Sequence, residues 1–140
     1  MIAAIYDLLE SIGFTQPLHP IPVRFTVAMV VGALIFALIA RFGNCATLYR
    51  TAQHAINFGI IAYLFTVPAG LLDWMHFYGG AWNYPIQMKM VFSFLLFPLL
   101  IAAFSLNSRN KSDSISIIVI YAAASVVVAV ITYFGGELVY

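Results

Sequence analysis

Three histidines are the side chains of this sequence best suited to metal or cofactor chemistry. His19 precedes one long apolar run and His76 follows the next, so antiparallel helices would carry both imidazoles to the same end of a bundle. Two such rings can supply the axial ligands of a b-type haem, and Arg24 can pair with a propionate. The sequence therefore predicts a haem site at this end. The alternative is structural, with His19 bonding loop backbone beside Pro20 and His76 lying among lipid headgroups.

The third histidine lies inside an apolar run, where a neutral imidazole needs a hydrogen-bond partner. His54 has Gln53 beside it and Asn57 one turn on, and either amide can orient its ring. This polar group predicts a ligand to a second haem or a hydrogen-bond donor to a quinone carbonyl. An interhelical hydrogen bond worth about 1 kcal/mol is the alternative.

Two carboxylates end apolar runs at the same predicted end as His19. We expect Asp73 and Glu137 to pair with Arg24 and so to lock this rim of the bundle. A carboxylate that transfers protons is the alternative. The pattern favours the structural role.

Several other kinds of site are absent from the sequence. The single Cys45 leaves no internal disulfide, no c-type haem attachment and no iron–sulfur cluster ligated by this chain alone. No nucleophile–base pair, Walker loop, zinc spacing or dinucleotide fingerprint is present. Methionine can ligate haem or copper, but we expect four of them to fill gaps in the core: Met29, Met75, Met88 and Met90. The pattern favours an electron-transfer or structural subunit over a stand-alone enzyme.

Composition places these side chains in a membrane. The 140 residues are 64% hydrophobic and 8% charged, with a mean hydropathy of +1.00. Soluble domains carry about 25% charged residues. The length suits one domain. A net charge of +1 forms no basic patch, so nucleic acid is not expected as a partner. We therefore predict an integral membrane protein in contact with the lipid bilayer.

Four apolar runs are each long enough to cross a hydrocarbon layer of about 30 Å as a helix. We predict spans at about 21–42, 48–72, 88–106 and 114–136. Their short connections favour an all-α four-helix bundle over residues 17–140, with the helices running up, down, up and down. Residues 1–16 place apolar side chains at helical spacing and predict an amphipathic helix in the membrane interface. No cleavable signal peptide is expected there.

Loop charges predict the orientation of the bundle. The loops after the first and third spans hold the basic residues Arg41, Arg50, Arg109 and Lys111. Acidic residues lie on the opposite side: Asp7, Glu10, Asp73 and Glu137. By the positive-inside rule, we expect both termini in the periplasm and the chain in a bacterial inner membrane. His54 then lies in the cytoplasmic half.

Three stretches at helix ends carry a family resemblance. They are Leu18-His19-Pro20, Gly70-Leu71-Leu72-Asp73-Trp74 and Gly135-Gly136-Glu137-Leu138-Val139-Tyr140. In this order they resemble the small four-helix bacterial membrane proteins known as domain of unknown function 2231, over Leu18 to Tyr140. Relatives stand alone or are joined to a Rieske-type iron–sulfur domain, which implies a link to respiratory electron transfer. Many relatives are expected to carry a further histidine near the start of the third span. This region of the chain reads QMKMVFSF and has no histidine.

These observations predict a membrane subunit of a respiratory or photosynthetic-type redox complex. It would carry one or two b-type haems, or bind quinone, and exchange electrons between a periplasmic Rieske or cytochrome partner and the membrane pool. A cofactor-free structural subunit of a larger membrane complex is the alternative. A transporter or channel is disfavoured because no single span carries the polar stripe expected of a pore.

Overall fold

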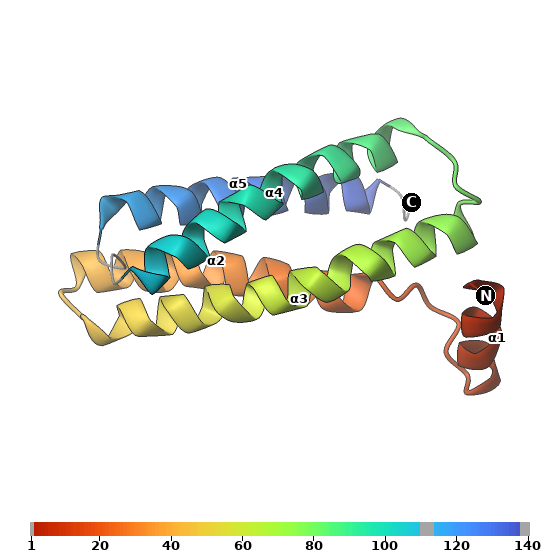
Figure 1. Ribbon diagram of the computed structural model, residues 1–140, viewed down its shortest axis with the longest axis horizontal. Coiled ribbons are helices and arrows are strands. Elements are labelled where there is room, and N and C mark those ends of the chain that lie inside the picture. The colour runs from red at the N-terminus through yellow and green to blue at the C-terminus, as the bar shows by residue number, and fades with distance from the viewer. Residues whose placement is uncertain (1, 110–113, 138–140) are drawn as a thin grey trace.

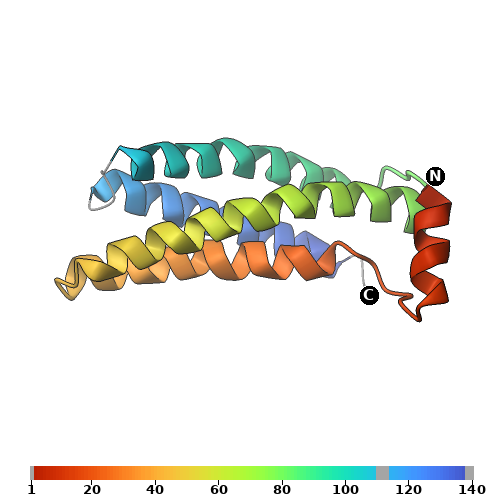
Figure 2. The ribbon, with the colours of Figure 1, turned by 60° about the horizontal axis from the view of Figure 1, so that its bottom comes forward.

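The computed structural model describes residues 2–109 and 114–137, and this part of the chain forms five helices. Four of them are long and apolar enough to cross a membrane: α2 (Pro20–Phe42), α3 (Thr47–Phe77), α4 (Tyr84–Ser108) and α5 (Ile115–Gly136). They run side by side in alternating directions, whereas the short α1 (Ile2–Ser11) stands across one end (Figures 1 and 2). The all-α, four-span architecture predicted from hydropathy is confirmed. Lys111 and residues 138–140 lie outside the described residues.

The helix ends follow local chemistry rather than hydropathy. Pro20 and Pro22 lie in the first turn of α2, where the missing N–H of proline removes no helical hydrogen bond. Asn83 caps α4 by accepting a hydrogen bond from the amide of Ile86 at 3.1 Å. Both α3 and α4 extend beyond their predicted limits at 72 and 88, because helical hydrogen bonding continues past the apolar run into the interface.

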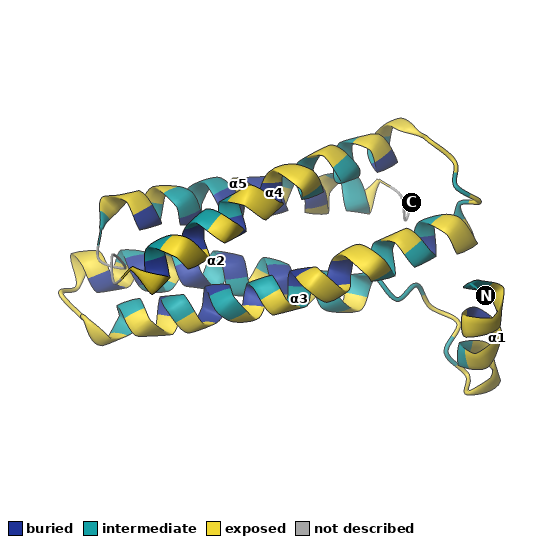
Figure 3. Cartoon of the chain, viewed as in Figure 1, coloured by how far each residue is buried: buried dark blue, intermediate teal, exposed yellow. Residues whose placement is uncertain are grey.

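The core of the bundle lies along α2, where small side chains allow close helix contact. α2 packs extensively against α3 and also against α5, and α4 packs against α5 (Figure 3 shows these inner faces buried). Ala33 and Ala37, four residues apart, are fully buried, whereas Ala28 on the same helix is exposed. Close packing of small residues therefore determines which face of α2 turns inward.

The seam between α3 and α4 is much shorter than the other seams of the bundle. The two helices meet where the Tyr63 hydroxyl donates to the carbonyl of Ser93 at 2.8 Å. The Tyr63 and Phe97 rings also lie 6.3 Å apart there. We call the end of the bundle with exposed Arg41, Arg50 and Arg109 the basic end. Space between α3 and α4 remains at this basic end.

Helix α1 stands at the opposite end of the bundle, which we call the α1 end. It is shorter than the predicted 1–16, because Gly13 adopts a positive φ of 83° that breaks the helix. Leu8 and Ile12 are 68% and 75% exposed, whereas Tyr6 on the other side of α1 is buried. Helix α1 is thus amphipathic and lies across the ends of the spans, and the interfacial location of this segment stays a prediction.

Close contact between α2 and α3 at Gly59 provides a test of this packing. A Cβ atom on Gly59 would lie 3.3 Å from the Met29 Cβ, so we expect Gly59→Leu to lower the free energy of unfolding. The expected loss is about 1–3 kcal/mol, as for overpacked cores. The measurement is unfolding in mixed detergent, with Gly32→Leu as control, because a Cβ on Gly32 meets no atom within 4 Å. Equal losses in both variants would contradict the described α2–α3 contact.

Candidate functional site

The α1 end is organised around the buried carboxylate of Asp73, in the last turns of α3. One oxygen, Oδ1, accepts a hydrogen bond from the Leu18 amide at 3.0 Å, and Oδ2 accepts one from the His19 amide at 2.7 Å. The hydroxyl of Tyr6 also donates to Oδ1. Amides at the start of a helix carry partial positive charge, so a carboxylate is favoured there. Asp73 therefore fixes both the start of α2 and the position of α1 against α3.

Asp73 does not form the ionic contact with Arg24 that the sequence predicts. Arg24 and Glu137 are exposed, and neither is among the hydrogen-bond or ion-pair partners of Asp73 within residues 2–109 and 114–137. The structure brings Asp73 instead to backbone amides and to a phenol. These neutral donors satisfy a buried carboxylate without the cost of burying a second charge.

Tyr6 joins α1 to the bundle. Its side chain is 3% exposed, and its ring stacks on the His76 imidazole with the centroids 3.8 Å apart and the planes at 11°. Burial, the hydrogen bond to Asp73 and the nearby carboxylate charge raise the pKa of Tyr6 well above its usual range. The phenol is therefore protonated and acts as the donor of that hydrogen bond.

His19 is held by α3 through its ring. Its Nδ1 lies 3.1 Å from the carbonyl oxygen of Thr66, which can only accept, so Nδ1 carries the proton. Burial lowers the pKa of His19, and the charge of Lys89 acts in the same direction, so the ring is neutral at pH 7. A Cβ on Gly70 would lie 2.8 Å from Nδ1. Only glycine at this position of α3 leaves room for the imidazole.

The structure does not bring His19 and His76 to a common cavity. The cavity beside His19 measures about 20 Å³, which suits one water molecule. His76 is exposed and stacks on Tyr6. The residues in this arrangement therefore do not fit a haem bound between these two rings. His19 keeps one ligand property, because its Nδ1–H is anchored and Nε2 is left with the lone pair.

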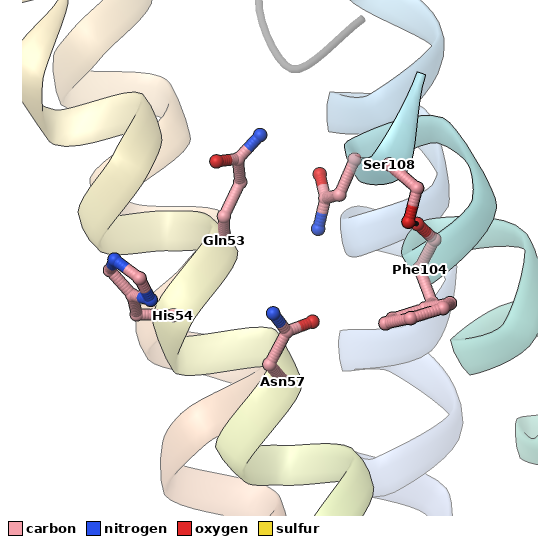
Figure 4. Close-up of a pocket in the computed structure, with 6 residues that line it drawn as sticks. Gln53, His54, Asn57, Phe104 and Ser108 are labelled. Atoms are coloured by element: carbon pink, nitrogen blue, oxygen red, sulfur yellow. Dashed lines mark hydrogen bonds between the residues drawn. The ribbon is translucent and has the colours of Figure 1, made fainter. Parts of the chain in front are cut away.

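A second polar site lies at the basic end, between α3 and α4. It is a cavity of about 140 Å³ lined by Gln53, His54, Asn57, Phe104, Asn107 and Ser108. In Figure 4, Gln53 and Asn57 extend from α3 toward α4, whereas the His54 ring lies on the other side of α3. His54 is exposed and also lines the cavity, and within the described residues neither amide is hydrogen-bonded to its ring as predicted.

One buried atom in this second site has no hydrogen-bond partner among the described residues. The Asn57 Oδ1 is buried and unpaired, whereas Asn107 and Tyr121 satisfy each other through contacts of 3.1 and 3.2 Å. A buried acceptor without a donor costs about 1–3 kcal/mol. The cavity is therefore suited to a ligand or water that donates a hydrogen bond to Asn57.

Sequence reasoning missed three residues of these sites. Lys89 is half-buried one and a half turns into α4. A charged residue within an apolar run indicates a functional position, so the sequence did carry a signal for Lys89. Thr66 and Tyr6 carried no such signal, because threonine in a span and tyrosine in an amphipathic helix are both ordinary. Their roles arise from contacts with residues 40 or more positions away.

Together, the fold and the two polar sites define a multi-pass membrane protein of four spans with polar groups inside each end of its bundle. Residues 15–140 match the family described as predicted membrane protein, DUF2231, and the chain belongs to that family. None of the curated proteins and none of the solved structures compared with the chain matches it. The structure gives a physical reason for two of the stretches on which the resemblance depends, since Gly70 and Asp73 hold His19 by its ring and its amide.

The tie between α1 and α3 can be tested at Tyr6. Tyr6→Phe removes the hydrogen bond to Asp73, which is worth about 1.5–3 kcal/mol for a charged acceptor. We expect faster amide hydrogen exchange in α1 and in the 12–19 linker, with the four spans unchanged. Tyr49→Phe serves as control, because Tyr49 lies at the basic end. Unchanged exchange in α1 of Tyr6→Phe would contradict the proposed attachment.

Proposed function

We propose that the protein is a membrane subunit of a redox complex and that its cavity at the basic end binds quinone from the membrane pool. The observation that carries this proposal is the amide-lined cavity with the unpaired Asn57 Oδ1. A quinol hydroxyl is a donor suited to that oxygen, and the amide N–H groups of Gln53 and Asn57 are donors suited to quinone carbonyls. Both oxidation states of one ligand thus find partners.

The lining of the cavity favours an uncharged ligand. None of its six residues is an aspartate, glutamate, lysine or arginine. Its volume of about 140 Å³ is close to that of an apolar cavity of about 150 Å³ known to accept benzene, so one ring fits. The Phe104 ring lies across the cavity from Asn57 (Figure 4) and offers an aromatic face to the ligand.

An apolar tail has a path along the open α3–α4 seam. Ile61 and Leu64 follow Asn57 by one and two turns on α3, and Ile101 and Phe97 precede Phe104 by the same intervals on α4. All four are exposed apolar side chains. A quinone with its head at Asn57 would lay its isoprenoid tail on this surface within the bilayer. Lateral entry from lipid therefore needs no opening of the bundle.

In the complex, quinone bound at the basic end would exchange electrons with a one-electron carrier on a partner subunit, which would relay them to a periplasmic Rieske or cytochrome domain. The basic end faces the cytoplasm by the positive-inside rule, which puts both termini in the periplasm of a bacterial inner membrane. Support for this orientation comes from Arg41, Arg50 and Arg109. The chain itself supplies binding and orientation, and the redox chemistry belongs to the bound groups.

The quinone site can be tested at Asn57. Asn57→Leu removes the amide, and we expect at least about tenfold weaker binding, since one hydrogen bond to a ligand is worth about 1.4 kcal/mol. The measurements are equilibrium dialysis of a short-tail quinone into nanodiscs and extraction of quinone that co-purifies with the protein. Phe58→Leu is the matched control, because Phe58 is adjacent and lipid-facing. Retention of phospholipid alone, or equal binding by Asn57→Leu, would overturn the proposal.

A b-type haem shared with another subunit is the second candidate, favoured by the anchored Nδ1–H of His19. His19 would supply one axial nitrogen, and bound haem would add one-electron transfer. We expect a reduced-minus-oxidised b-type spectrum in the native complex, lost in His19→Ala and kept in His76→Ala, because His76 stacks on Tyr6. A colourless complex isolated with haem available would rule this candidate out. If quinone is absent as well, a structural subunit is the better account.

A further inference from the structure

Polar groups from all four spans converge in the core of the bundle, although no single span carries a polar stripe. We propose that this file of amide, hydroxyl and imidazole groups conducts protons between the basic end and the α1 end. The proposal does not need quinone to bind, although the file opens at the basic end into the cavity between α3 and α4. Three residues that follow one another along α5 mark successive levels of the file through the membrane.

The file begins at the basic end with Tyr121. Its hydroxyl is buried and exchanges hydrogen bonds with Asn107, which also lines the cavity of about 140 Å³. A cavity of that size with polar walls holds several waters when no other ligand is bound. Protons from the basic end therefore have a hydrated approach to the Tyr121 hydroxyl.

Ser125 lies one turn further along α5, about 6 Å deeper at 1.5 Å per residue. Its Oγ is buried and has no hydrogen-bond partner among the described residues. A serine hydroxyl in a helix can usually bond to the carbonyl four residues earlier, so an unpaired one in the core indicates a missing partner. Water between the Tyr121 and Ser125 hydroxyls would bridge the interval and give the Ser125 Oγ the partner it lacks.

The next level is marked by Val128, three residues or about 4.5 Å beyond Ser125. Val128 lines the cavity of about 20 Å³. Its polar walls come from α2, α3, α4 and the residue before α2: Tyr63, Thr66, Thr26, Ser93 and His19. This volume suits one water. The Thr26 and Thr66 hydroxyls are 3.2 Å apart. The cavity therefore lies between the level of Ser125 on α5 and the neutral ring of His19, which lines it.

The file ends at the α1 end with three ionisable groups. Lys89 is half-buried near the start of α4, at this end of the bundle, and it has no hydrogen bond or ion pair within the described part of the chain. Asp73 is already occupied by three donors. A half-buried amine with no fixed partner can exchange protons with the interface. Lys89 is thus the terminal proton carrier of the proposed file.

The dimensions of the file select protons over other ions. A metal ion crossing the core would need a shell of oxygen ligands at every level, and the about 20 Å³ cavity holds a single water. A proton needs only a chain of hydrogen bonds. One proton enters at one end as another leaves at the other, so charge balances without a co-reactant.

Proton flux into proteoliposomes tests the proposal. The protein is reconstituted around a pH-sensitive dye, and a potassium gradient with valinomycin supplies the driving force. We expect wild-type flux above that of protein-free vesicles. Ser125→Ala and Thr66→Val each remove a hydroxyl of the file. We expect the proton flux of each variant to be at least about tenfold lower than that of the wild type. Ser125→Thr keeps the hydroxyl and should keep the flux. Thr132→Val is the matched control, because Thr132 is exposed and bonds only within its own helix.

Three results would overturn the proposal. They are wild-type flux equal to that of protein-free vesicles, unchanged flux in both Ser125→Ala and Thr66→Val, and an equal fall in Thr132→Val. Helical content and elution volume verify that each variant is folded, and Ser125→Thr provides the comparison if Ser125→Ala does not fold. Quinone binding is measured separately at Asn57, so failure of the proton file and failure of the quinone site give different results.

Discussion

A carboxylate buried at the end of a membrane span must be fully hydrogen-bonded, and Asp73 imposes this requirement on the α1 end of the molecule. Its partners are backbone amides that precede α2 and a phenol from α1, so three segments distant in sequence meet at one side chain. The same contact positions His19, whose ring then fits against Gly70. Helix packing sets the direction of α2 and α3, and Asp73 sets where α2 begins.

The two ends of the bundle differ because its four seams are unequal. Small residues bring α2 close to α3, whereas α3 and α4 make fewer contacts, among them the hydrogen bond of Tyr63. At the basic end this leaves amides of α3 and α4 around a cavity, and at the α1 end it leaves hydroxyls around a space for one water. The candidate ligand site and the proposed proton file are therefore consequences of one packing asymmetry.

Few polar residues line the two sites of this bundle, and the sequence alone gives only a weak indication of their roles. The sequence groups the amides of Gln53 and Asn57 with His54, yet in the bundle these amides extend toward α4 and His54 is exposed. The histidines at the α1 end were expected to share a cofactor, but one is anchored to Thr66 and the other stacks on Tyr6. Helix rotation decides such partnerships, and a residue's neighbours along the chain do not fix it.

Hydropathy alone was sufficient to predict four spans, their order and their approximate limits, because a bilayer demands long apolar helices whatever surrounds them. Asp73 and Asn57 were also identifiable as polar residues needing a partner. The identity of each partner is decided only in three dimensions, where Tyr6 reaches Asp73 across 67 residues and the Asn57 oxygen finds no partner within the described part of the chain. Hydrogen-bond partners depend on the rotation and spacing of packed helices, and those are set by contacts among side chains from the whole bundle.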